Sequence, residues 1–161
     1  MVEETFAAAI EAKVRQQWTG GPYSEQARAA LAQHADSIQR WTADYHRLER
    51  LAPDRVWVPT HGETHSANQV VTAKEVVFVD WESLKLAPRE RDLRPLLDAG
   101  YADLVRPDWP MVEMFDLEWR LDELSEYSSW FSRPHEGSAS DQVAIAGLIE
   151  ELERPEWKRP D

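Results

Sequence analysis

The sequence predicts a mainly α protein of the α+β class, with one short antiparallel β-hairpin in a single domain spanning residues 1–161. Apolar residues recur at three- and four-residue spacing over most of the chain, which is typical of helices that pack on one face. Residues 69–79 instead hold two β-branched runs around a polar turn. With 42% apolar residues and eight tryptophans, a chain of this length can bury a hydrophobic core.

Residues 1–50 are predicted to be a helical segment. A first helix is expected over residues 3–18 and ends before Gly20-Gly21-Pro22, because glycine and proline disfavour helix continuation. Ser24 is expected to cap a second, longer helix running to about Arg50. The apolar stripes of the two helices comprise Phe6, Ile10, Val14 and Trp18, and then Ala27, Leu31, Ile38, Trp41, Tyr45 and Leu48.

Residues 55–92 are predicted to hold the loops that carry chemistry. A short extended piece at residues 56–58 precedes a polar loop, and the strands 69–71 and 76–79 follow as a hairpin. Because a lone hairpin is marginal in water, we expect it to pack on the helices. Its second strand should bring Asp80 back beside the loop, and the segment from Ser83 to Pro88 is expected to be irregular.

Residues 93–153 are predicted to be a second helical segment, before a polar tail at 154–161. A first helix carries Leu93, Leu96, Leu97 and Tyr101. A longer one runs from about 111 to 131, and after a linker at 133–140 Asp141 is expected to cap a last helix through Leu152. For the long helix, the core candidates are Met114, Leu117, Leu121, Leu124 and Trp130, and the acids are Glu113, Asp116, Glu118, Asp122, Glu123 and Glu126.

Charge and composition narrow the partners. A formal net charge of −12 without clustered Lys or Arg argues against nucleic acid and favours cationic ligands, although a solvated acidic surface is the simpler explanation for most of the acids. No apolar run is long enough to span a bilayer, and the start lacks the basic and apolar regions of a signal peptide, so a cytoplasmic location is expected. The absence of cysteine leaves carboxylates, imidazoles, hydroxyls and amides for chemistry.

The densest polar segment is Thr60–Asn68, together with the Asp80-Trp81-Glu82 that follows the hairpin. Asn68 and Asp80 offer oxygen ligands on either side of the hairpin, a set that suits Mg²⁺ bound to a polyphosphate. Glu63 precedes Asn68 in the same loop, where a carboxylate could accept the proton of an attacking hydroxyl. These residue types are the components of phosphoryl transfer.

Two other interpretations fit the same residues. The spacing His61-x-x-x-His65 could indicate zinc, but the helical zinc motif places a glutamate directly after its first histidine, where this chain has Gly62. Alternatively, His61, Asn68 and Asp80 could simply cap turns around the hairpin.

The order of these residues resembles the catalytic core of the aminoglycoside phosphotransferase and choline kinase-like family. That family's pattern is His-Gly-Asp-x-His-x-x-Asn, followed by Asp-Trp-Glu or Asp-Phe-Asp. The matching segments here are His61-Gly62-Glu63-Thr64-His65-Ser66-Ala67-Asn68, Val79-Asp80-Trp81-Glu82, Pro88 and Arg91-Asp92-Leu93, with a weaker match at Trp18-x-x-Gly21-Pro22-Tyr23.

The resemblance implies the helical carboxy-terminal lobe of a protein-kinase-like fold and an ATP-dependent phosphotransferase that uses Mg²⁺. It puts Glu63 at the position of the catalytic base and Asn68 and Asp80 at the positions that bind the metal and the nucleotide. His61 would buttress the loop and His65 would help to shape it. The remaining implied roles are an anchor for the loop backbone at Asp92 and a place near the metal or the substrate mouth for Glu82.

The sequence departs from that family in two ways. Glu63 stands where the family has aspartate, which moves the carboxylate by about 1.5 Å, one carbon bond. The amino-terminal nucleotide lobe also has no counterpart, since there is no glycine-rich loop and no lysine in a plausible nucleotide-binding strand. The lysines considered are Lys13, Lys74, Lys85 and Lys158.

Two functions therefore remain open. The first is the catalytic lobe of a small-molecule kinase that phosphorylates a hydroxyl, and the acidic helix of residues 113–126 would suit a cationic substrate. The second is a non-catalytic truncated or pseudokinase lobe that binds a ligand or partner, for which we expect a homodimer covering the surface left by the missing lobe. As a single lobe, the chain is expected to bind Mg-ATP weakly and to turn over slowly or not at all.

Overall fold

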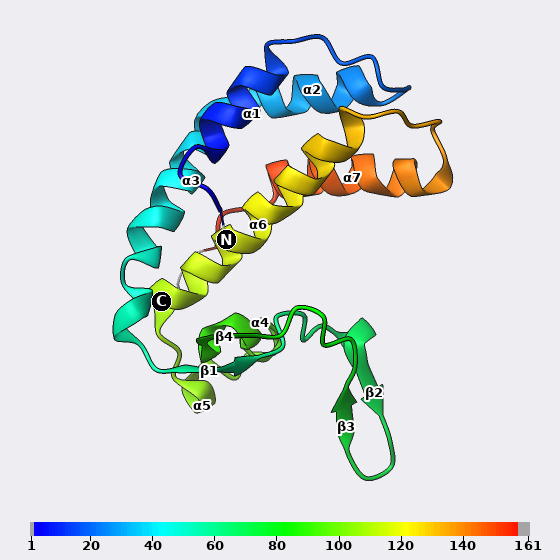
Figure 1. The fold of residues 1–161 in the computed structure, drawn as a ribbon. Helices are drawn as coiled ribbons and strands as arrows, with labels where there is room; N and C mark the ends of the chain where they lie inside the picture. Colours follow the sequence, from blue (N-terminus) through cyan, green and yellow to red (C-terminus); the bar gives the residue numbers. More distant parts are fainter. Residues whose placement is uncertain (1, 158–161) are drawn as a thin grey trace. The chain divides into compact units, whose positions relative to one another are not determined.

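A computed structural model describes residues 2–157, which divide into two compact units (Figure 1). The helical unit combines residues 2–47 with residues 116–157. The loop unit comprises Leu48–Phe115. The mainly α prediction is confirmed.

The core of the helical unit is built from side chains that the sequence placed on helix stripes. Leu31, Leu121, Leu124 and Leu148 are fully buried, as is Phe131. Helix α1 contacts α2, and α2 contacts α7 (Figure 1). The helices that contribute are α1 Phe6–Val14, α2 Ser24–Gln33, α3 Ala35–Glu49, α6 Trp109–Phe131 and α7 Ala139–Glu153, of which α3 and α6 continue into the other unit.

The long second helix predicted from the sequence is wrong, because the chain bends at His34 to give two helices. His34 has φ −101° and ψ 13°, and its ring Nδ1 lies 2.9 Å from the carbonyl oxygen of Ala30. The apolar stripe nevertheless continues across the bend, since both helices bury their predicted faces. Ser24 is not a cap: it is the first residue of α2, and its hydroxyl donates to the carbonyl of Phe131 at 2.7 Å.

The acidic face predicted for residues 111–131 is partly buried. Asp116 is buried and accepts a hydrogen bond from the half-buried Arg154 at 2.7 Å, so this carboxylate pairs with a cation instead of facing solvent. Arg120 is fully buried, with its guanidinium 4.4 Å from the centroid of the Trp41 ring, and burial lowers the pKa of Arg120. Trp130, predicted in the core, is instead 42% exposed.

The start of α7 forms a capping box. Ser138 is the N-cap and accepts from the backbone N–H of Asp141. The Asp141 carboxylate in turn accepts from the N–H of Ser138 and from the indole of Trp130, and these bonds, the Trp130 indole above all, lower the pKa of Asp141. The N-cap residue is therefore Ser138, and Asp141, at the third position of the helix, completes the capping box.

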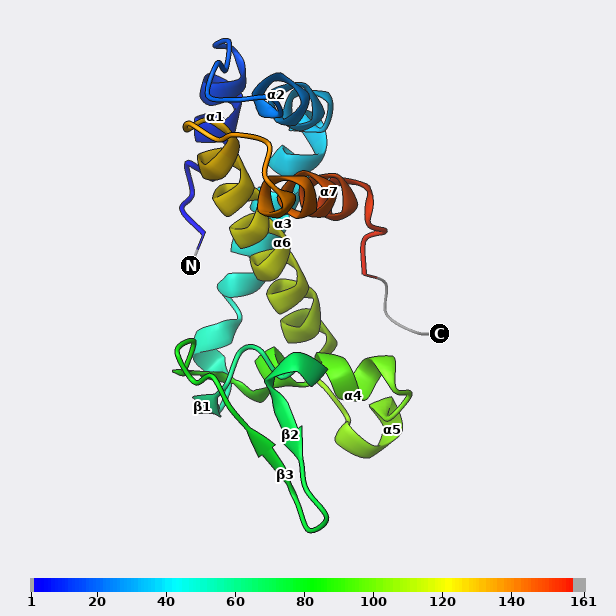
Figure 2. The ribbon, with the colours of Figure 1, turned by 90° about the vertical axis from the view of Figure 1, so that its right-hand side faces the viewer.

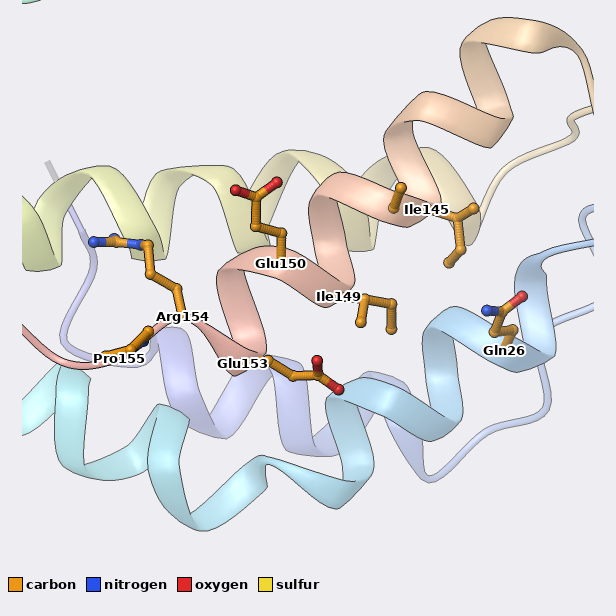
Figure 3. A pocket seen from close by; sticks show the side chains of 8 residues that line it. Gln26, Ile145, Ile149, Glu150, Glu153, Arg154 and Pro155 are labelled. Carbon is orange, nitrogen blue, oxygen red and sulfur yellow. The ribbon is translucent and has the colours of Figure 1, made fainter.

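A hollow of about 720 Å³ lies along α2 and α7 in the helical unit (Figure 3). Ile145 and Ile149 form its apolar part, while Gln26 and Glu153 add polar groups. No residue that the sequence singled out for chemistry lines this hollow.

The strands within residues 2–157 form two separate two-stranded sheets, both in the loop unit (Figure 2). Strands β1 Trp57–Thr60 and β4 Lys85–Pro88 pair antiparallel, with Thr60 opposite Lys85. Strands β2 Gln69–Val71 and β3 Val76–Phe78 form the predicted hairpin. The irregular segment predicted at residues 83–88 is therefore wrong from Lys85 onward.

Within the described residues of the loop unit, the predicted packing of the hairpin on helices is not observed. Val71 is 74% exposed and Val76 is 51% exposed, and β2 and β3 chiefly contact each other. The loop unit also contains short helices before, between and after the strands: η1 Ala52–Asp54, η2 Ser66–Asn68, η3 Arg89–Asp92, α4 Arg94–Asp98 and α5 Ala102–Val105. Among the helices of residues 2–157, none has both the length and the apolar character needed to cross a bilayer.

Candidate active site

Asp92 clamps the backbone of the polar loop. One carboxylate oxygen accepts from the N–H of His61 and the other from the N–H of Gly62, both at 2.7 Å. The Thr64 hydroxyl returns a bond to the Asp92 carbonyl at 3.1 Å. Charge-assisted bonds of this kind are stronger than neutral ones, so the start of the loop is held against η3.

His61 joins the loop to the end of the hairpin. Its side chain is 3% exposed, and its ring lies 4.6 Å from the centroid of Trp81. The Nε2 atom lies 2.9 Å from the Val79 carbonyl oxygen, and the Nδ1 atom accepts from the N–H of Glu63 at 3.3 Å. These partners correspond to a neutral ring with its proton on Nε2. His61 is thus committed to backbone groups on both sides.

Glu63 and Asn68 lie side by side. The Asn68 amide donates to the Glu63 carbonyl at 3.1 Å, and its nitrogen lies 3.5 Å from the Glu63 Oε2 atom. Asn68 is 8% exposed, and this orientation of its amide leaves the Oδ1 atom as the oxygen ligand it can offer. The other carboxylate oxygen of Glu63 accepts from the Ser83 hydroxyl at 2.5 Å.

Asp80 directly follows Val79, whose backbone N–H and carbonyl both contact the polar loop. The Val79 N–H donates to the Asn68 carbonyl at 3.0 Å, and the Val79 carbonyl faces His61. Asp80 itself has φ +64°, a left-handed conformation that aspartate tolerates better than most residues. Its carboxylate is exposed, and no partner for it occurs within residues 2–157.

His65 and Glu82 are less closely tied to this cluster. The His65 side chain is exposed, and only its carbonyl takes part, by accepting from the Asn68 N–H at 3.1 Å. Glu82 is exposed too, and in the described part of the chain its carboxylate has no hydrogen-bond partner. The roles suggested for these two residues stay predictions.

Sequence reasoning assigned no role to Ser83, or to Arg91 beyond its place in the matched segment Arg91-Asp92-Leu93. The Arg91 Nη1 atom donates to the Thr60 hydroxyl at 3.0 Å and to the Ser83 carbonyl at 2.9 Å. The guanidinium occupies the space above Gly62, where an added Cβ would lie 2.1 Å from Nη2, and Gly62 has φ +91°. The sequence offered one signal for this contact: the matched motif contains both an arginine and a glycine, which has no Cβ to block the guanidinium.

The zinc site suggested by the histidine spacing does not form within the described residues. Within residues 2–157 no group of three or more His, Asp or Glu side chains gathers in a way that could hold a metal. His61 uses both ring nitrogens on backbone groups, so the histidine pair of the zinc interpretation is not brought together. Asn68 and Asp80 present oxygens, which suit Mg²⁺ completed by phosphate and water.

Comparison with known proteins places this geometry in a family context. No family model matches the chain. The structure is similar to the crystal structure of spectinomycin phosphotransferase APH(9)-Ia in complex with ADP and spectinomycin, with a TM-score of 0.72 over 95% of this chain at 16% identity. The chain has an aminoglycoside-phosphotransferase-like fold. The resemblance inferred from its sequence is thereby confirmed.

A sequence relative matches most of the chain. Protein StrN of Streptomyces griseus is 32% identical over 145 residues, or 84% of this chain. The matched part of this protein covers 43% of the length of StrN and 52% of the spectinomycin phosphotransferase chain. It therefore corresponds to about half the length of the relatives it matches.

Proposed function

We propose that this chain is the catalytic half of an ATP-dependent small-molecule phosphotransferase that transfers the γ-phosphoryl group to a substrate hydroxyl. The observation that carries the proposal is the pairing of Glu63 with Asn68 on a loop clamped by Asp92, with the residue before Asp80 bonded to Asn68. The phosphotransferase fold and the neighbour's complex with ADP and spectinomycin support a nucleotide and a hydroxylated small molecule as ligands.

In this proposal Glu63 accepts the proton of the attacking hydroxyl. The clamp by Asp92 and His61 fixes the loop beforehand, so little reorganisation is needed when the substrate arrives. Asn68 Oδ1 and the Asp80 carboxylate would hold Mg²⁺, whose charge neutralises the phosphates. The net charge of −12 supports a cationic acceptor.

The metal assignment is tested by Mg²⁺-dependent ATP binding, measured by isothermal titration calorimetry. Asp80→Asn removes the charge while keeping a residue that accepts the left-handed backbone. We expect it to weaken Mg-ATP binding at least about tenfold, because it removes an anionic ligand of the cation. Asp98→Asn, an exposed site with the same charge change, is the matched control and should bind like the wild type.

Equal affinity of Asp80→Asn and the wild type would overturn the metal assignment. A wild-type chain that binds no Mg-ATP at millimolar concentration would favour the non-catalytic ligand- or partner-binding module instead.

A further inference from the structure

We propose that Ser83 is a positioning residue that fits the glutamate at position 63 to the role of the base. This inference rests on the proposed function and deepens it. It assigns a task to a side chain outside the loop, at the start of the segment that leads into β4, and it explains how a longer acid can serve where the related pattern has aspartate.

The extra methylene of Glu63 creates a positioning problem. It lengthens the side chain by about 1.5 Å and adds a rotatable bond, so an unsupported carboxylate would sample several positions. The structure shows the support: the Ser83 hydroxyl donates to Glu63 Oε1 at 2.5 Å. The Asn68 amide, 3.5 Å from Oε2, is too distant to hold the group by itself.

Ser83 is held in place in turn. Its carbonyl accepts from Arg91 Nη1 at 2.9 Å, and the same nitrogen donates to the Thr60 hydroxyl at 3.0 Å. Thr60 is 1% exposed, so this connection ends on a rigid, buried strand residue. A continuous set of hydrogen bonds therefore runs from β1 through Arg91 and Ser83 to the carboxylate of Glu63.

The contacts distinguish the two carboxylate oxygens. Oε1 is occupied by the Ser83 hydroxyl, whereas Oε2 points toward Asn68, the neighbouring ligand candidate. Oε2 is accordingly the atom that takes the proton. In the transfer step the substrate O–H bond breaks and its proton goes to Oε2, the substrate oxygen forms a bond to the γ-phosphorus, and the bond from that phosphorus to the bridging oxygen breaks, leaving its electron pair on ADP.

The test is steady-state Mg-ATP hydrolysis by the full chain, with water standing in for the substrate hydroxyl. Ser83→Ala should lower kcat about tenfold and leave KM for Mg-ATP unchanged, because the base is misplaced while the metal ligands are intact. Ser83→Thr keeps the hydroxyl and should restore most of kcat. Ser132→Ala, at an exposed serine in the helical unit, is the matched control.

A double-mutant cycle with Glu63→Asp separates positioning from general damage. The shorter aspartate does not reach Ser83, so adding Ser83→Ala to Glu63→Asp should change kcat less than twofold. An unchanged kcat in Ser83→Ala, or equal losses in the two backgrounds, would overturn the positioning role and leave the proposed function standing. A wild-type chain without Mg-ATP turnover would likewise overturn the positioning role, whereas the proposed function is decided separately, by the calorimetric test of Mg-ATP binding.

Discussion

Different interactions stabilise the interior of the helical unit and the polar loop of the loop unit. In the helical unit, leucines such as Leu121 and Leu148 are fully buried, so apolar burial dominates its stability. In the loop unit, the hairpin valines are exposed, and the polar loop is fixed by bonds from Asp92, Arg91 and His61. A functional site needs directional contacts, and hydrogen bonds supply them in the polar loop of the loop unit.

The largest expected effect comes from breaking the apolar side of this contrast. Leu121→Ala leaves a cavity among fully buried neighbours and should lower the free energy of unfolding by about 3 kcal/mol in urea denaturation. Leu104→Ala, at a side chain that is 79% exposed, should change it by less than about 0.5 kcal/mol. Similar losses at the two positions would show that burial is not what stabilises the helical unit.

The next effect comes from breaking the polar side. Asp92→Asn turns one acceptor oxygen into an NH₂ group facing a backbone N–H, which should cost about 2 kcal/mol. Amide hydrogen exchange should show faster exchange at His61 and Gly62, with the helical unit unchanged. Asp98→Asn supplies the control. Protection retained at both amides would contradict the clamp.

The smallest effect sharpens the contrast within the loop unit. Val71→Thr replaces an apolar side chain that is 74% exposed with a β-branched polar one of similar shape. We expect the free energy of unfolding to change by less than about 0.5 kcal/mol, again in urea denaturation. A loss above about 1 kcal/mol would mean that something covers this valine in solution.

Hydrophobic periodicity predicted most of the helical unit. The stripe from Ala27 to Leu48 is buried as expected, but it gave no sign of the bend at His34, because apolar spacing continues across the bend without glycine or proline. β4 was missed for a related reason. Lys85–Pro88 lacks alternating β-branched residues and pairs only with another short strand, so its conformation depends on a partner distant in sequence.

For the candidate site, the sequence predicted the motif residues but not all of the residues that hydrogen-bond to them. The structure brings Glu63, Asn68 and the residue before Asp80 together, and it puts Asp92 on the loop backbone. No role was predicted for Ser83 or for Arg91, because their contacts join segments that are separate in sequence, and no spacing rule reports such contacts. The valines predicted the hairpin, but their exposure to solvent was not predicted, because it depends on the surrounding fold.

The left-handed backbone at Asp80 restricts which substitutions this position accepts. Asparagine and glycine adopt that conformation readily, while β-branched and bulky residues are strained there. Asp80→Asn is therefore the substitution that removes the negative charge while keeping both the shape of the side chain and the backbone conformation. If Asp80 holds the metal as proposed, a descendant that no longer bound it could keep its fold by this single step, and asparagine or glycine at this position would mark the change in its sequence.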